Sequence, residues 1–192
     1  MEKEPLQITD PEEISYDGFK EEILKDYRIA RISRETSSLG RKEVLTGKAK
    51  FGIFGDGKEV AQLAMAKHFK PGDFRSGYYR DQTFMMAAGL LTVKEFFAQL
   101  YADPDIEHDP SSGGRQMNSH SATRSLNSDG SWKDLSKMKN SSADMAPTAS
   151  QMPRLLGLAY ASKFYRQNKE LTALKGFSDG GNEVAFGTIG DS

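Results

Sequence analysis

The sequence predicts an α/β protein, in which helices pack around a sheet. Stretches of helical periodicity alternate with short extended segments, and the composition supports a packed core. The last apolar segment, 184–189, has the features of a buried strand and runs into Gly190 and Asp191. In open α/β sheets ligands lie at the carboxyl ends of strands, and a carboxylate there can hold a metal-bound phosphate. We therefore expect the chain to be the N-terminal part of a larger enzyme.

Length and composition exclude several classes of protein. The 192 residues suit one domain, expected at 17–192 after a polar lead-in at 1–16. The net charge of -1 provides no basic surface for nucleic acid, so no nucleic-acid partner is expected. Cysteine is absent, which excludes disulfides, zinc thiolate sites and cysteine nucleophiles and is compatible with the cytoplasm, the expected location. Neither a secretory leader nor an apolar run near the ~20 residues of a membrane span is present, so no membrane association is expected.

The first predicted helix follows the lead-in. Phe19, Ile23 and Tyr27 are spaced along one helical face, which we expect to be its packed side. The pattern ends near 37–40, where serine and glycine interrupt it.

The remaining helical patterns cover 58–69, 81–88, 92–101 and 150–168, and 74–80 is a short extended segment. The strongest local signal is the capping box at Thr92 and Glu95, in which each side chain bonds the other residue's backbone amide. On the apolar face of the last helix we place Met152, Leu155, Leu156, Ala159, Tyr160 and Phe164.

Residues 103–143 form a long segment rich in Asp, Ser, Asn and Gly. A connection of this length is either functional or partly disordered. We expect it to be mobile without a bound ligand, because it has too little apolar surface to offset the entropy lost on ordering. Trp132, the only tryptophan, indicates that part of the segment docks on the rest of the protein.

Three polar motifs are candidates for a site, each with a simpler alternative. The planar guanidinium of Arg80 suits phosphate oxygens, unless Arg80 is a surface residue paired with Asp81. His120, in a glycine-rich loop, suits proton donation near neutral pH, although a lone histidine is more often incidental. Gly55-Asp56-Gly57 resembles a phosphate loop, but we interpret it as a turn into the helix that follows.

Taken in order, these segments resemble the alpha part of thiamine-diphosphate-dependent 2-oxo acid dehydrogenases, especially the branched-chain (2-oxoisovalerate) type. The resemblance covers about 20–192 and rests on Tyr79-Arg80-Asp81, Phe96-Phe97-Ala98-Gln99-Leu100-Tyr101, Gly114-Arg115-Gln116-Met117 with His120, Ala149-Ser150-Gln151-Met152-Pro153, Gly157-Leu158-Ala159-Tyr160-Ala161 and Gly190-Asp191. It implies a thiamine-diphosphate-binding fold with a parallel sheet and flanking helices, truncated at its C-terminal side.

The resemblance also implies roles for individual residues. Cofactor contacts fall on Tyr79, Arg80, Ala146, Pro147, Thr148, Gly190 and Ser192. The first magnesium ligand is Asp191, a potassium site falls on Pro147, Ser150 and Gln151, and the active-site histidine is His120. Relatives have Ser-Pro-Leu where this chain has Ala146-Pro147-Thr148, and a serine in place of Met145.

The implied reaction is oxidative decarboxylation of a 2-oxo acid, with thiamine diphosphate, Mg²⁺ and K⁺ as cofactors and transfer of the acyl group to the lipoyl group of a partner acyltransferase. A beta part, fused or separate, would complete the site, so the 192 residues alone are expected to be inactive. Two other classes remain open: a non-catalytic α/β interaction module, and a magnesium-dependent enzyme for phosphate ligands such as a phosphotransferase.

Overall fold

The computed structural model describes residues 15–190 of the chain. The helices are α1 (Tyr16–Leu45), α2 (Glu59–Lys67), α3 (Gln82–Ala87), α4 (Val93–Leu100) and α5 (Gln151–Gln167), with short 3-10 turns η1 (Leu135–Lys137) and η2 (Lys169–Ala173). The strands are β1 (Phe74–Ser76), β2 (Asn140–Ser141) and β3 (Ala185–Gly187). This arrangement confirms the predicted α/β class.

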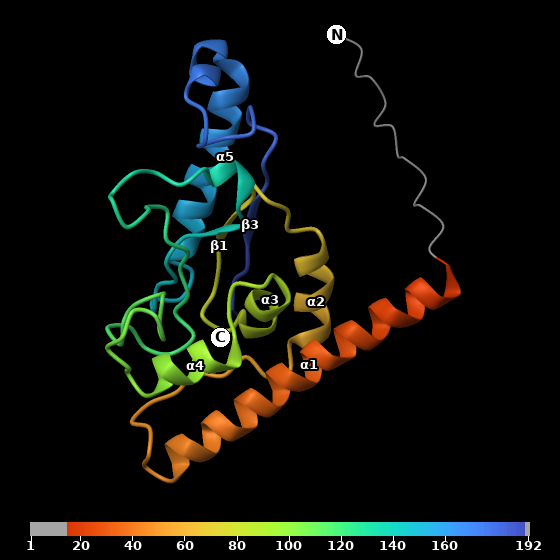
Figure 1. Ribbon diagram of the computed structural model, residues 1–192, viewed down its shortest axis with the longest axis vertical. Coiled ribbons are helices and arrows are strands. Elements are labelled where there is room, and N and C mark those ends of the chain that lie inside the picture. The colour runs from red at the N-terminus through yellow and green to blue at the C-terminus, as the bar shows by residue number, and fades with distance from the viewer. Residues whose placement is uncertain (1–14, 191–192) are drawn as a thin grey trace.

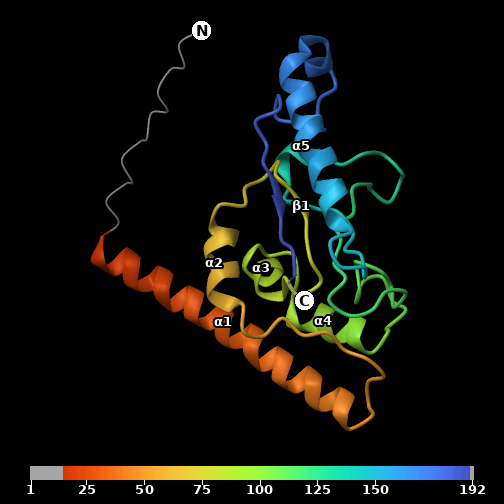
Figure 2. The same cartoon turned by 180° about the vertical axis from the view of Figure 1, so that it is seen from behind.

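The three strands form a parallel sheet in the order β2-β1-β3, with Phe74 aligned with both Asn140 and Ala185. Figures 1 and 2 show the sheet between α5 on one side and α2 with α3 on the other. Because the strands are parallel, their carboxyl ends share one edge of the sheet. The expectation of a buried last strand was wrong: β3 is an edge strand of this sheet, and its residues are half-buried or exposed.

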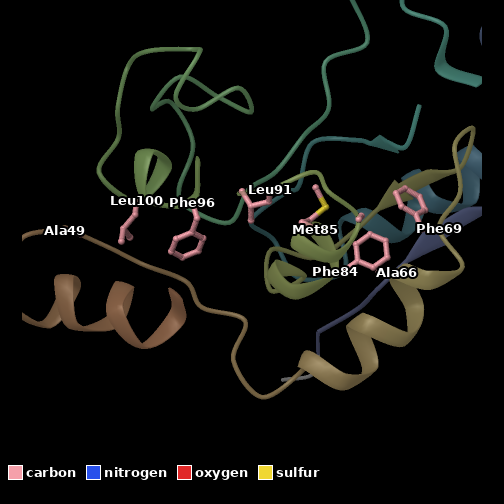
Figure 3. Close-up of a cluster of buried hydrophobic side chains, with 9 residues drawn as sticks. Ala49, Ala66, Phe69, Phe84, Met85, Leu91, Phe96 and Leu100 are labelled. Carbon is pink, nitrogen blue, oxygen red and sulfur yellow. The ribbon is translucent and has the colours of Figure 1, made fainter. Parts of the chain in front are cut away.

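The hydrophobic core extends from α2 past α3 to α4 (Figure 3). Phe69 lies at the sheet end of this core, with its ring centroid 5.2 Å from that of Phe84 and 5.1 Å from that of Phe186 on β3. Phe96 extends this core to the loop that follows α1, where it meets Phe54 at 6.3 Å. Aromatic packing therefore connects the helices to the sheet and to the segment at 51–55.

Helix α1 is longer than predicted, and its packed side is different. The apolar residues Phe19, Ile23 and Tyr27 are exposed, and the start of α1 extends past the other helices (Figure 1). Helix α2 reaches this half of α1 through polar contacts, in which Lys67 pairs with Glu22 and Asp26. The buried side uses Ser33, Thr36, Ser37, Gly40 and Glu43.

Small residues let α1 approach closely. A Cβ at Gly40 would lie 2.5 Å from the Phe54 ring. The Ser33 hydroxyl lies 2.7 Å from that of Thr83 on α3. Ser37 and Gly40, in the stretch that seemed to end the helix, are thus part of its contact surface.

The predicted capping box is confirmed, and a glycine follows the end of α3. The Thr92 hydroxyl accepts from the Glu95 amide at 3.2 Å, and the Glu95 carboxylate accepts from the Thr92 amide at 2.7 Å. Gly89 follows α3 with φ +76°, the left-handed conformation that glycine adopts most readily.

The segment 103–143 is not free of regular structure, since it contains η1 and β2. Strand β2 was missed because it is short and polar, with no apolar alternation to reveal it. Its Asn140 is held by the side-chain amide, which donates to the carbonyls of Asp73, Leu135 and Met138. Trp132 is exposed but its ring meets Phe177 edge-on at 5.3 Å.

Helix α5 begins one residue later than predicted and has Pro153 in its first turn. Its predicted apolar face is largely solvent-exposed, notably at Leu156, Tyr160 and Phe164, because only one side of the helix lies against the sheet. Leu155 is the contact residue there, and a Cβ at Gly187 would lie 2.3 Å from it. Across 15–190, no helix combines the length and apolar character that a membrane crossing requires.

Candidate active site

The predicted site residues lie beyond the carboxyl ends of the strands. Tyr79 and Arg80 follow β1, the segment 146–151 follows β2, and Gly190 follows β3. Gly190 lies against the Tyr78 ring, where an added Cβ would be 2.2 Å from Cζ. Segments far apart in sequence thus meet at one edge of the sheet. Asp191 and Ser192 lie outside the described residues.

Tyr79, on the segment after β1, contacts the segment after β2 and the loop that carries His120. Its ring stacks on that of His120, with centroids 5.5 Å apart and planes 16° from parallel. Its hydroxyl accepts a hydrogen bond from Tyr78 at 2.9 Å, and the two tyrosine rings lie 4.1 Å apart. The bond from Tyr78, and a further one from Thr148, lower the pKa of Tyr79. The structure therefore brings together Tyr79, Thr148 and His120.

The imidazole of His120 is buried, with only 3% of the residue exposed. Its Nδ1 lies 3.2 Å from the carbonyl oxygen of Asn118, which can only accept, so Nδ1 carries a proton. Nε2 is buried and has no hydrogen-bond partner among residues 15–190. In the neutral ring Nε2 is then a proton acceptor, and it donates only when the ring is charged. A buried polar atom without a partner is costly, which points to a ligand that would satisfy it.

The loop that carries His120 is attached to the segment after α1. The Asn118 side chain accepts from the Ile53 amide and donates to the Ile53 carbonyl, both at 2.8 Å. Ser119 has φ +64°, a strained conformation for a residue with a side chain. Gln99 on α4 donates to the His120 carbonyl at 2.9 Å. The imidazole is consequently held by contacts on both sides of its loop.

Arg80 and Tyr79 line a cavity of about 550 Å³. The cavity is also lined by Arg41, Phe51, Gly52, Ile53, Phe54 and Asp56. Gly55-Asp56-Gly57 is the turn expected before α2, and its Asp56 is part of the cavity wall. Asp56 is bonded there by Arg41 at 2.7 Å. Because Arg41 is paired with Asp56, Arg80 is the guanidinium of this lining that suits an anionic ligand.

The simpler alternative for Arg80, a pair with Asp81, does not hold, because Asp81 bonds the buried Arg75 instead. The Arg75 guanidinium lies 2.8 Å from Asp81 and 3.0 Å from Asp144, with all three side chains almost fully buried. Burial alone would lower the pKa of Arg75, but the two carboxylates raise it above its ordinary value, so the residue stays charged. Arg80, half-buried, is left facing the cavity.

Sequence reasoning missed Arg75, Asp144, Asn118 and Arg41. One signal for Arg75 was available: a charged residue inside a three-residue strand must find partners when buried. Asp81 is only six residues away, but Asp144 lies 69 residues away, so the complete pairing could not be predicted.

The segment 146–151 has its own internal bonds. The Ser150 hydroxyl donates to the Pro147 carbonyl at 2.6 Å, so it does not cap α5. The Gln151 amide donates to the Thr188 carbonyl at 2.6 Å. Ala149 has φ +65°, a second strained position beside the site. The potassium site at Pro147, Ser150 and Gln151 stays a prediction.

The described residues do not form a divalent-metal site by themselves. Between residues 15 and 190, no three His, Cys, Asp or Glu side chains gather as metal ligands would. The predicted ligand, Asp191, lies outside the described residues. Magnesium commonly takes one or two carboxylates and completes its shell with phosphate oxygens, so a single carboxylate fits a metal that is shared with a phosphate ligand.

Comparison with known proteins identifies the family. Residues 27–192 match the family described as dehydrogenase E1 component. The chain is 29% identical over 136 residues to the protein named 2-oxoisovalerate dehydrogenase subunit alpha from Bacillus subtilis (strain 168). The alignment covers 70% of this chain and 36% of that relative. The chain belongs to the dehydrogenase E1 component family of thiamine-diphosphate-dependent 2-oxo acid dehydrogenases, and its resemblance is to the alpha part.

Proposed function

We propose that the chain contributes the alpha part of an enzyme that decarboxylates a 2-oxo acid and transfers the acyl group to the lipoyl group of a partner acyltransferase. The observation that carries this proposal is the convergence of Tyr79, Arg80, Thr148 and His120 from three separate segments. A beta part, in the same or another chain, would complete the site. The expected substrate is a branched-chain 2-oxo acid, in keeping with the apolar side chains of Phe51, Ile53 and Phe54 at the cavity.

Thiamine diphosphate would be held by its charged tail. Arg80 offers a cation and a planar fork for the diphosphate, and Tyr79 lines the same cavity. The backbone of Ala146, Pro147 and Thr148 is expected to contact the thiamine portion. Asp191, with Gly190 and Ser192 around it, would hold Mg²⁺ against the diphosphate, and K⁺ would bind at the neighbouring loop. When bound, the cofactor supplies an electron sink.

His120 would manage a proton close to the reacting carbonyl group. Its Nδ1 is occupied by the Asn118 carbonyl, so the exchangeable position is Nε2. A neutral ring accepts a proton there, and a charged ring can return it or hydrogen-bond an oxygen atom that gains negative charge. The stack with Tyr79 fixes the plane of the imidazole, and the contact of Nδ1 with the Asn118 carbonyl sets the direction of Nε2 within that plane.

Calorimetry with thiamine diphosphate and Mg²⁺ on the assembled enzyme tests the proposal. We expect binding, and we expect Arg80→Ala to weaken it about 10- to 100-fold, because a charged hydrogen bond contributes about 1.5–3 kcal/mol. Arg31→Ala is the matched control, since Arg31 forms an exposed pair with Glu35 on α1. Absence of cofactor binding would support an interaction module, and binding of a nucleotide instead would support a phosphotransferase.

A further inference from the structure

One buried guanidinium joins the two loops that carry the candidate site. Arg75 lies in the central strand β1 and is 1% exposed. It donates to Asp81 at 2.8 and 3.1 Å, to Asp144 at 3.0 and 3.3 Å, to the Ser141 hydroxyl at 2.8 Å and to the Tyr78 carbonyl at 3.0 Å. Tyr78 and Asp81 lie on the loop after β1, Ser141 lies in β2 and Asp144 lies on the loop after β2, so Arg75, Asp81 and Asp144 tie one loop to the other.

The first route from Arg75 to His120 runs through Asp144. The Asp144 carboxylate accepts from the Ser121 amide at 3.1 Å. The Asp144 amide donates to the Ser121 carbonyl, also at 3.1 Å. Ser121 directly follows His120, so this two-way contact holds the backbone from which the imidazole extends.

The second route runs through the loop after β1. The Asp81 carboxylate accepts from the Tyr78 amide at 3.0 Å, and Arg75 binds the carbonyl of the same residue. Tyr78 in turn bonds the Tyr79 hydroxyl, and the Tyr79 ring stacks on His120. The imidazole is therefore reached from its backbone side and from its ring face, and both paths begin at one guanidinium.

Gly77 leaves the space that this arrangement needs. A Cβ at position 77 would lie 2.1 Å from both Cζ and Nε of Arg75, well inside contact distance. Buried ion pairs often stabilise a fold no better than apolar residues of the same volume. Their directional bonds, however, can specify a geometry, which is the property that a reacting group requires.

We propose that Arg75 and Asp144 are positioning residues that hold the His120 imidazole in one orientation and one tautomer, with Nδ1 protonated and Nε2 free for a ligand. The role of that imidazole in the reaction rests on the proposed function, whereas its orientation does not. The two are tested separately, because orientation can be measured without cofactor or turnover.

The test is ¹⁵N NMR of histidine side chains in the 192-residue chain at a pH where imidazole is neutral. There are three histidines, so His68→Gln and His108→Gln assign the signals. The wild-type His120 should show one protonated and one unprotonated nitrogen, at Nδ1 and Nε2. Asp144→Asn removes a charge and an acceptor, so we expect these separate signals to move toward a common averaged position.

Glu59→Gln is the control, because it makes the same acid-to-amide change in a buried carboxylate bound to Arg34. It should leave the His120 signals unchanged. A folded Asp144→Asn protein with the wild-type His120 spectrum would overturn the proposal, and so would an equal change in Glu59→Gln. If Asp144→Asn does not fold, Ser141→Ala decides: it removes one bond to Arg75, and unchanged His120 signals in that variant also overturn the proposal.

Discussion

The buried charged residues Arg75 and Glu59 are both ion-paired, but their partners differ. Arg75 faces two carboxylates and lies beneath the candidate site, whereas Glu59 is bound to one arginine at the start of α2. Glu59 accepts from Arg34 at 2.7 and 2.9 Å and from the Gly57 amide at 3.1 Å. Multiple donors stabilise the ionised form of a carboxylate, and the bond from Arg34 is the main reason that the pKa of Glu59 falls from 4.5 to about 2.

This pKa predicts how stability depends on acid. Because the folded pKa lies below the unfolded one, the stabilisation from ionised Glu59 is complete above pH 4.5 and is lost as the pH falls toward 2. Denaturant unfolding of the wild type and of Glu59→Gln should differ on the order of 2 kcal/mol at pH 6. The difference should shrink steadily between pH 4.5 and pH 2. A difference that does not depend on pH would mean that the ion pair is not the cause.

At the scale of elements, the start of α4 followed a local rule, whereas the buried faces of α1 and α5 did not follow the apolar pattern. The capping box of α4 needs only residues within one turn, and the structure has both of its bonds. The packed side of α1 depends on what lies across from it, and its partners are polar groups of α3. Local signals therefore predict where α4 begins, whereas tertiary contacts determine which side of α1 is buried.

The capping box provides a direct test of helix stability. Thr92→Ala removes the acceptor for the Glu95 amide and should lower the free energy of unfolding by about 1 kcal/mol. Thr92→Ser keeps a hydroxyl and should stay close to the wild type. Chemical denaturation measures both variants, and an equal loss for alanine and serine would show that the hydroxyl bond is unimportant.

The predicted mobility of 103–143 can be tested by limited proteolysis without cofactor. The structure leads us to expect a gradient within this segment. Asp109 is 2% exposed and binds the Ser112 hydroxyl and the Gly114 amide, whereas Leu126 and Trp132 are exposed. Trypsin should therefore cut first within 124–133, as measured by mass spectrometry. Resistance of the entire segment would contradict the predicted mobility.

At the scale of the whole molecule, the site and several apolar surfaces are open. The cavity beside Arg80 is lined from α1, from the loop that follows it and from the loop after β1. Apolar side chains of α1 and α5 are exposed, including Tyr16, Tyr27, Leu156 and Tyr160. Such surfaces suit contacts with other protein segments.

We expect the 192-residue chain alone to catalyse no decarboxylation, because the proposed reaction needs groups from a beta part. Product formation from a 2-oxo acid should appear only when a beta part is supplied with thiamine diphosphate and Mg²⁺. The His120→Gln variant of this chain, with the same beta part, should reduce turnover about 100-fold or more if the imidazole transfers a proton. Turnover by the purified chain alone would overturn this prediction.

The sequence by itself determined the capping box and the α/β class and located the helices, and through family resemblance it predicts Tyr79, Arg80 and His120 as site residues. These features depend on short-range periodicity or on local motifs. Tertiary structure alone decided that Arg75 pairs with Asp81 and Asp144, that β2 is a polar strand, and that Nε2 of His120 is buried without a protein partner in the described range. The pair of Arg75 and Asp144 joins groups that are 69 residues apart, and burial makes such pairing strong only after the sheet has brought the groups together.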